Sequence, residues 1–233
     1  MADIFQEVDE AINQDRFKQQ MRKYGPWVVG AALLIVGGVA GWEGWSALTK
    51  RAAAESSDQF IVAQTAFEDG DTDLANVGFE TLILDGESGY RTLALLRQAA
   101  ISQEAGDAAA AAALYVEAAD SISDPVIADL ARLKSVWVQW DTLSYADIEL
   151  RLAPVATPGS PYIHLARESQ AAAALRDGAL DPAESTYLWL TTNFDTPQGV
   201  RIRAQRALAI LEQMRTEAAA GAPAETAGDG GNE

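Results

Sequence analysis

Helix-boundary residues recur in this sequence every 36 positions. Pro125, Pro161 and Pro197 are separated by 36 residues twice in succession. Proline is tolerated in the first turn of a helix, where its missing N–H would have no helical partner anyway. The three prolines therefore predict the starts of equivalent helices. A period near 36 residues, with two helices in each unit, predicts an all-α fold of the solenoid type, because each pair can bury its apolar face only against its neighbours.

A packing pattern follows each predicted turn between the two helices of a unit. The predicted turns lie at Gly70, Gly106, Asp141 and Gly178. The fifth and ninth residues after each turn pair a small residue with a large one: Ala75 and Phe79, Ala111 and Tyr115, Ala146 and Leu150, and Ala183 and Tyr187. A step of four residues places each pair on one helical face. We therefore expect these eight residues to pack the second helix of each repeat.

These units resemble the tetratricopeptide repeat family, whose repeat is about 34 residues long. The stretch GDAAAAAALYVEAA, residues 106–119, is the best match to that family's turn and second helix. The small residue of the family's first helix has counterparts at Ala63, Ala99 and Ala171, whereas the third repeat has Lys134 there. The resemblance implies four degenerate tetratricopeptide-like repeats over residues 53–194 with a concave protein-binding surface. A final helix, Pro197 to Arg215, would cap the stack.

A second constraint is an uncharged apolar stretch near the N-terminus. No charged residue occurs from residue 26 to residue 42. At about 1.5 Å per residue, such a helix almost crosses a hydrocarbon core of about 30 Å. Trp27, Trp42 and Trp45 lie at its two ends, where tryptophan favours the level of the lipid headgroups. We predict a transmembrane helix over residues 25–47.

The flanks of this stretch predict its orientation. Four basic residues precede it and two follow it closely: Arg16, Lys18, Arg22 and Lys23, then Lys50 and Arg51. The excess of positive charge predicts a cytoplasmic N-terminus and places the body on the other side of the membrane. A cleaved signal peptide is the alternative, with residues 52–54 as its small-residue cleavage site. The long leader and the extended apolar core favour an uncleaved anchor.

The glycines of the predicted span share one helical face. Gly30, Gly37, Gly41 and Gly44 are separated by 7, 4 and 3 residues. The spacing of Gly37 and Gly41 is typical of transmembrane helices that pack closely against a partner helix. The alternative is that glycine is simply frequent in membrane helices.

The remaining segments flank the span and the repeats. Residues 1–24 have apolar residues at helical spacing and predict an amphipathic cytoplasmic head helix. This helix would lie on the membrane or dock against a protein, and the alternative is a flexible amphipathic leader. Gly25 and Pro26 should break or kink that helix. Residues 48–216 form the predicted solenoid with its capping helix. Residues 217–233 contain no large apolar side chain and predict a disordered acidic tail.

Composition and motifs exclude several classes of function. The first 51 residues carry equal numbers of acidic and basic residues, so the rest carries the whole net charge of −17. A body this acidic repels nucleic acid. The chain has no cysteine and a single histidine, His164, which we interpret as a groove or packing residue. No nucleotide-binding, nucleophile or zinc motif occurs. We therefore expect neither an enzyme nor a cofactor.

One acidic fragment has the spacing of a calcium loop. Asp69, Asp71 and Asp73 occupy its first, third and fifth positions, and Glu80 its twelfth. The sixth position, where the sharp turn requires glycine, is Leu74. An acidic residue in the first turn of a helix explains Asp73 better, so we expect no metal.

The order of these parts resembles the YfgM-type family, ancillary subunits of the bacterial Sec translocon. The head, IFQEVDEAINQDR followed by RKYG, is similar to the alphaproteobacterial branch. The resemblance implies an inner-membrane protein whose periplasmic repeat domain associates with translocon subunits, periplasmic chaperones and secretory clients. The alternative is an envelope scaffold that organises an outer-membrane-assembly or cell-division complex.

Overall fold

The computed structural model describes the backbone of residues 3–221, and the side chains of Trp27 and residues 34–217. This part of the chain contains nine α-helices and no strand, in agreement with the predicted all-α class. The helices are α1 (Asp3–Glu68), α2 (Thr72–Asp85), α3 (Ser88–Glu104), α4 (Ala108–Asp120), α5 (Pro125–Trp137), α6 (Tyr145–Leu152), α7 (Ile163–Arg176), α8 (Leu180–Thr192) and α9 (Gln198–Gly221). The chain divides into two units, Met1–Glu55 and Ser56–Glu233.

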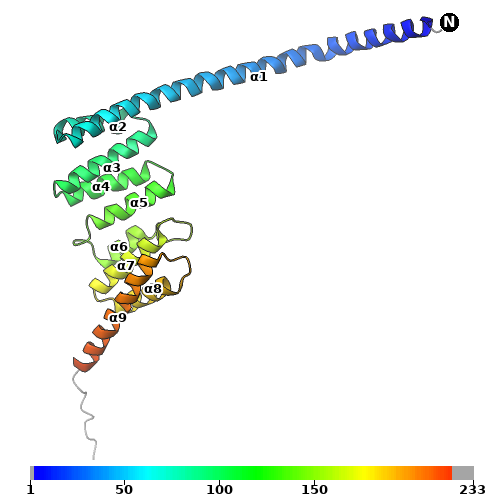
Figure 1. The fold of residues 1–233 in the computed structure, drawn as a ribbon. Helices are drawn as coiled ribbons and strands as arrows, with labels where there is room; N and C mark the ends of the chain where they lie inside the picture. The colour runs from blue at the N-terminus through cyan, green and yellow to red at the C-terminus, as the bar shows by residue number, and fades with distance from the viewer. Residues whose placement is uncertain (1–2, 222–233) are drawn as a thin grey trace, which may run out of the picture. The chain divides into compact units, whose positions relative to one another are not determined.

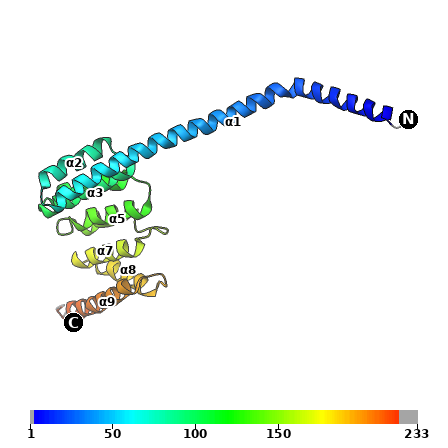
Figure 2. The ribbon, with the colours of Figure 1, turned by 45° about the horizontal axis from the view of Figure 1, so that its top comes forward.

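The first unit is helical throughout its described length. The helix is not broken at Gly25 and Pro26, where a break or a kink was predicted, and Figure 2 shows a bend in the blue, N-terminal part of α1. A Cβ atom added at Gly37, Gly41 or Gly44 would meet no atom within 4 Å. Gly30 lies outside the residues whose side-chain surroundings are described.

Among the residues that the structure describes in full, no helix is long and apolar enough to cross a membrane. Residues 25, 26 and 28–33, in the first half of the predicted span, fall outside that set.

The second unit is a stack of helix pairs (Figure 1). The end of α1 pairs with α2, α3 with α4, α5 with α6, and α7 with α8, after which α9 packs on α8 and α7. Pro125 is the first residue of α5, while α7 and α9 begin just after Pro161 and Pro197. The last helix runs beyond the predicted cap, so residues 217–221 are helical rather than disordered, and the rest of the predicted tail lies outside the described residues.

Glycine turns join the two helices of three repeats. Gly70, Gly106 and Gly178 have φ of +85°, +82° and +78°. After Gly70 the backbone N–H of Asp71 donates to the carbonyl of Ala66 at 2.9 Å, which is the Schellman arrangement. The carboxylate of Asp71 then accepts from the N–H of Leu74 and caps α2. One residue thus ends the first helix and starts the second.

Replacing Gly106 with alanine should lower the free energy of unfolding by about 1–2 kcal/mol, because an alanine pays this cost in a left-handed conformation. No atom lies within 4 Å of the added Cβ, so the effect is purely one of backbone conformation. Gly89→Ala in α3 is the matched control, since Gly89 also has an open Cβ position but no positive φ. Urea denaturation should show Gly89→Ala to be neutral or slightly stabilising. Equal losses in both variants would contradict this account of the turn.

The buried positions of each second helix lie at constant distances along the sequence from its N-cap residue. The N-caps are Asp71, Asp107, Ser144 and Ala179. The fourth, eighth and eleventh residues after each N-cap are buried: Ala75, Phe79 and Leu82; Ala111, Tyr115 and Ala118; Ile148, Leu152 and Val155; and Ala183, Tyr187 and Leu190. The predicted packing residues of the first, second and fourth repeats are therefore all in the core.

The third repeat has a different register from the predicted one. Ala146 is exposed and Leu150 is 75% exposed, so the prediction was wrong for this pair. Asp141 lies in the connection between α5 and α6, but the connection continues to Ser144, whose side chain and Asp147 form a capping box. Ile148 and Leu152 take the core positions instead.

The change of register in the third repeat also explains why Lys134 stands where the first helices of the other repeats have a small residue. Eight residues before each N-cap stand Ala63, Ala99, Val136 and Ala171, and all four are buried. Val136, rather than Lys134, is therefore the core residue of the third repeat. The Lys134 side chain is left facing outward from the packed pair.

Burial of Tyr187 makes the stability of the folded state depend on pH in the alkaline range. Burial, with a smaller contribution from Glu168, raises the pKa of Tyr187 from 10.0 to about 12. The folded state thus favours the neutral phenol, and this contribution is complete below pH 10 and is lost as the pH rises through 12. Stability should fall more steeply over this range in the wild type than in Tyr187→Phe, as measured by urea denaturation at each pH. Identical slopes would contradict the assignment.

Candidate protein-binding groove

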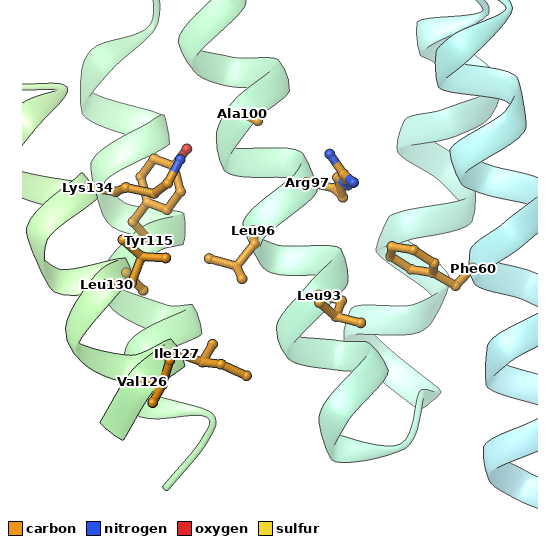
Figure 3. A pocket seen from close by; sticks show the side chains of 11 residues that line it. Phe60, Leu93, Leu96, Arg97, Ala100, Tyr115, Val126, Ile127, Leu130 and Lys134 are labelled. Carbon is orange, nitrogen blue, oxygen red and sulfur yellow. The ribbon is translucent and has the colours of Figure 1, made fainter. Parts of the chain in front are cut away.

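Apolar side chains of three successive repeats enclose a groove of about 410 Å³ in the second unit. Its lining comes from the end of α1 and from α3, α4 and α5 (Figure 3). The lining residues are Phe60, Leu93, Leu96, Arg97, Ala100, Tyr115, Val126, Ile127, Leu130, Ala131 and Lys134. Nine of these eleven side chains carry no charge, so the groove offers a mainly hydrophobic surface.

The repeat geometry places these residues side by side. Leu93 and Leu130 both lie fourteen residues before the N-cap of their repeat, and Arg97 and Lys134 both lie ten residues before it. Equivalent positions of successive first helices therefore face the same groove. None of these positions was predicted as a site residue, although their recurrence at the repeat period was a signal in the sequence.

Tyr115 is a core residue that also lines the groove. It was predicted as a packing residue, and the structure exposes only 1% of it. Its hydroxyl lies 3.3 Å from Oε1 of Gln103, and its ring borders the groove. Tyr115 therefore belongs both to the core and to the lining of the groove.

Two cationic side chains lie at one end of the groove. Figure 3 shows Arg97 and Lys134 near Ala100, with Val126 and Ile127 toward the opposite end. The Lys134 Nζ lies 5.3 Å from the centroid of the Tyr115 ring, within cation–π range. Neither Arg97 nor Lys134 makes an ion pair with any residue that the structure describes. The groove is thus apolar with a positive end.

A second apolar hollow, of about 440 Å³, lies on the outer side of the first helix pair. Val62, Leu74 and Val77 contribute its exposed apolar side chains. The helices come close here, because a Cβ added at Gly78 would stand 2.7 Å from the Cβ of Ala63. This hollow contains no cationic side chain.

His164 is a packing residue that stacks on an aromatic ring. Its ring stacks on Trp189 with centroids 5.6 Å apart, and Arg167 covers the same indole at 4.0 Å. Burial lowers the pKa of His164, because desolvation disfavours its charged form. The histidine does not line the groove.

The acidic fragment before α2 is a helix cap. Asp71 accepts the hydrogen bond from Leu74 described above, which uses the carboxylate for capping. Within the described residues, no group of three or more potential ligands is placed to hold a metal ion.

A family profile described as a tetratricopeptide repeat-like domain matches residues 18–155. The match covers more than half of the 233 residues. The chain belongs to the tetratricopeptide repeat-like family. In this tetratricopeptide repeat-like protein, the matched region includes every residue of the groove. Its last residue, Val155, is also the last core residue of the third repeat, while α7–α9 continue the stack beyond the match. No curated protein and no solved structure matches the chain.

Proposed function

We propose that this protein is a membrane-anchored module that holds segments of other polypeptides in the groove between α1, α3 and α5. The observation that carries the proposal is the apolar groove of about 410 Å³, built from equivalent positions of successive repeats. A tetratricopeptide repeat-like domain supports a protein-binding role. The groove volume lies within the range of about 300–1,000 Å³ that is usual for pockets that hold small molecules.

The proposed setting is the bacterial inner membrane. Residues 25–47 would span the membrane with residues 1–24 in the cytoplasm, and the repeats would lie in the periplasm beside the Sec translocon. The order of the parts, similar to that of the YfgM-type family, supports this setting. The groove would then receive emerging secretory proteins and pass them to periplasmic chaperones. A tether raises the effective concentration of a weak binding site, so affinity for each client can be low.

Photocrosslinking in cells tests the groove. A photoreactive residue at Leu93, which is 40% exposed in the groove, should trap many different secretory proteins. The control is the same residue at Leu150, which is 75% exposed outside the groove. Equal crosslinking from both positions would contradict the proposal. A single stable adduct from Leu93 would instead favour the alternative, an envelope scaffold in a fixed complex.

A topology reporter fused after residue 215 tests the setting. The account expects periplasmic reporter activity. A cytoplasmic reporter would rule out both the translocon proposal and the envelope scaffold.

The glycine face of the proposed span is testable in the same cells. Because a Cβ at Gly37 or Gly41 meets nothing within 4 Å, leucine at both positions is accommodated by the chain itself. Loss of co-purification with translocon subunits in mild detergent would therefore report a lost helix partner. Unchanged co-purification would remove this part of the proposal.

A further inference from the structure

We propose that the outer face of the first helix pair binds the last helix, α9, of a second copy of this chain. The contact would join the beginning of one stack of repeats to the end of another. It uses surfaces outside the groove between α1, α3 and α5. The inference therefore goes beyond the proposed function and does not depend on it.

The first helix pair presents a face that is covered in every later repeat. Thirteen residues before the N-cap of their second helices, the later repeats have Ala94, Ala131 and Ala166. All three are fully buried, each in a cluster with residues of the preceding repeat. The first repeat has Asp58 at this position, and Asp58 is exposed. Within the described structure, the equivalent face of the first pair thus has no repeat to cover it.

This uncovered face is apolar around its aspartate. Val62, Leu74 and Val77 line the outer hollow together with Asp58, and 54–64% of each of these three apolar residues is exposed. The end repeats of a solenoid usually carry a polar outer face, because no neighbour covers them. An apolar end face with a hollow of about 440 Å³ instead indicates a surface for a partner. We call these four residues the α1–α2 face.

The helix α9 presents the second surface, at the other end of the stack. Its inner side is buried in the last cluster through Ala204 and Leu211. Ile202, Arg206 and Ile210 follow one another at steps of four residues on the opposite side of the helix, and all three are exposed. We call these three residues the α9 face.

The charges of the two surfaces are complementary. Residues 56–85 contain seven acidic residues and no basic one. In contrast, α9 contains four arginines and two glutamates, although the chain as a whole has a net charge of −17. Neither Asp58 nor Arg206 makes an ion pair with any residue that the structure describes. Both charges are therefore available for a contact between copies.

This complementarity selects a head-to-tail contact, in which the α9 face of one copy meets the α1–α2 face of the next. Two α1–α2 faces would bring acidic surfaces together, and two α9 faces would oppose Arg206 with its own copy. Like charges at an interface penalise such pairings. Within one chain, α9 packs on α8 and α7, and the intervening helices separate it from the α1–α2 face (Figure 1). A second copy supplies both apolar side chains for the hollow and a cation for Asp58.

Disulfide crosslinking tests the contact, because the chain contains no cysteine of its own. Full-length Val77→Cys and Ile210→Cys proteins, one of them carrying a mass tag, are mixed in mild detergent and oxidised. We expect the mixed adduct to be the main product, since the contact brings these two positions together. The control replaces Val77→Cys with Leu150→Cys, which is exposed outside both faces and should give little adduct.

Charge reversal then tests the pairing of Asp58 with Arg206. Adding Arg206→Glu to the Ile210→Cys chain should reduce the mixed adduct by about tenfold or more, because like charges then face each other. Adding Asp58→Arg to the Val77→Cys chain should restore the adduct with that variant. Both residues are exposed, so the folded state tolerates the changes. Arg151→Glu reverses an exposed charge outside both faces and should leave the adduct unchanged.

Each other outcome identifies a different arrangement. Mixed adduct no greater than that of the Leu150→Cys control would overturn the inference, and so would adduct that survives Arg206→Glu. Efficient crosslinking of Val77→Cys chains to one another would show a symmetric contact and would also overturn it. The same holds if Val77→Cys in native membranes crosslinks to a different protein in place of a second copy.

Discussion

Replacing Leu152 with alanine is expected to lower the free energy of unfolding by about 2–5 kcal/mol, the usual cost of truncating a fully buried leucine. Leu152 lies in the cluster that joins the third repeat to α7 of the fourth, together with Leu133, Val136 and Ile148. Urea denaturation followed by circular dichroism measures the change. The variant should shift the midpoint strongly without changing the helical content of the folded state.

Leu150→Ala is the matched control for this result. Leu150 stands on the same short helix, α6, but is 75% exposed. Its truncation should change stability by no more than about 0.5 kcal/mol. The opposite order of effects would show that the register follows Asp141 rather than Ser144, and the account of the third repeat would be wrong.

Replacing Arg176 with alanine should destabilise the protein by about 2–3 kcal/mol, because it leaves polar groups of a structured connection without partners. The Arg176 guanidinium donates to the backbone carbonyls of Trp140 and Leu143 and pairs with Asp177 at 2.7 Å. Asp177 in turn accepts from the N–H of Tyr145 at 2.6 Å. This network ties the last turn of α7 to the connection before α6.

Arg151→Ala is the control that separates the loss of this network from the general effect of removing an arginine. Arg151 makes a single exposed hydrogen bond, to Oε1 of Gln139 at 2.8 Å. Its loss should be near neutral in thermal denaturation, whereas Arg176→Ala should lower the melting temperature by several degrees. Similar small shifts in both variants would show that the connection does not depend on Arg176.

The turns of three repeats could be predicted from the sequence because a local rule determines them. Gly70, Gly106 and Gly178 supply the positive φ that ends a helix, and the core positions follow at fixed distances. The third repeat has no such glycine, and Asp141, at the corresponding position of the 36-residue period, does not mark the start of α6. A capping box of Ser144 and Asp147, readable in the sequence, marked the true start of α6.

The groove could not be predicted in the same way, because it depends on how successive repeats are superposed. Arg97 and Lys134 are 37 residues apart, and the misplaced third turn put Lys134 among the core positions instead of beside Arg97. Only the true N-cap, Ser144, aligns the two cations. The correction of one turn therefore changes both the core and the candidate site.

We propose that partner polypeptides bind in the groove lined by α3 and α5. Amide hydrogen exchange of the full-length protein, with and without an unfolded secretory protein, tests it most directly. The account predicts slower exchange in α3 and α5 on binding, with α7 and α8 unchanged. Protection confined to α7–α9, or to the outer hollow between α1 and α2, would contradict it.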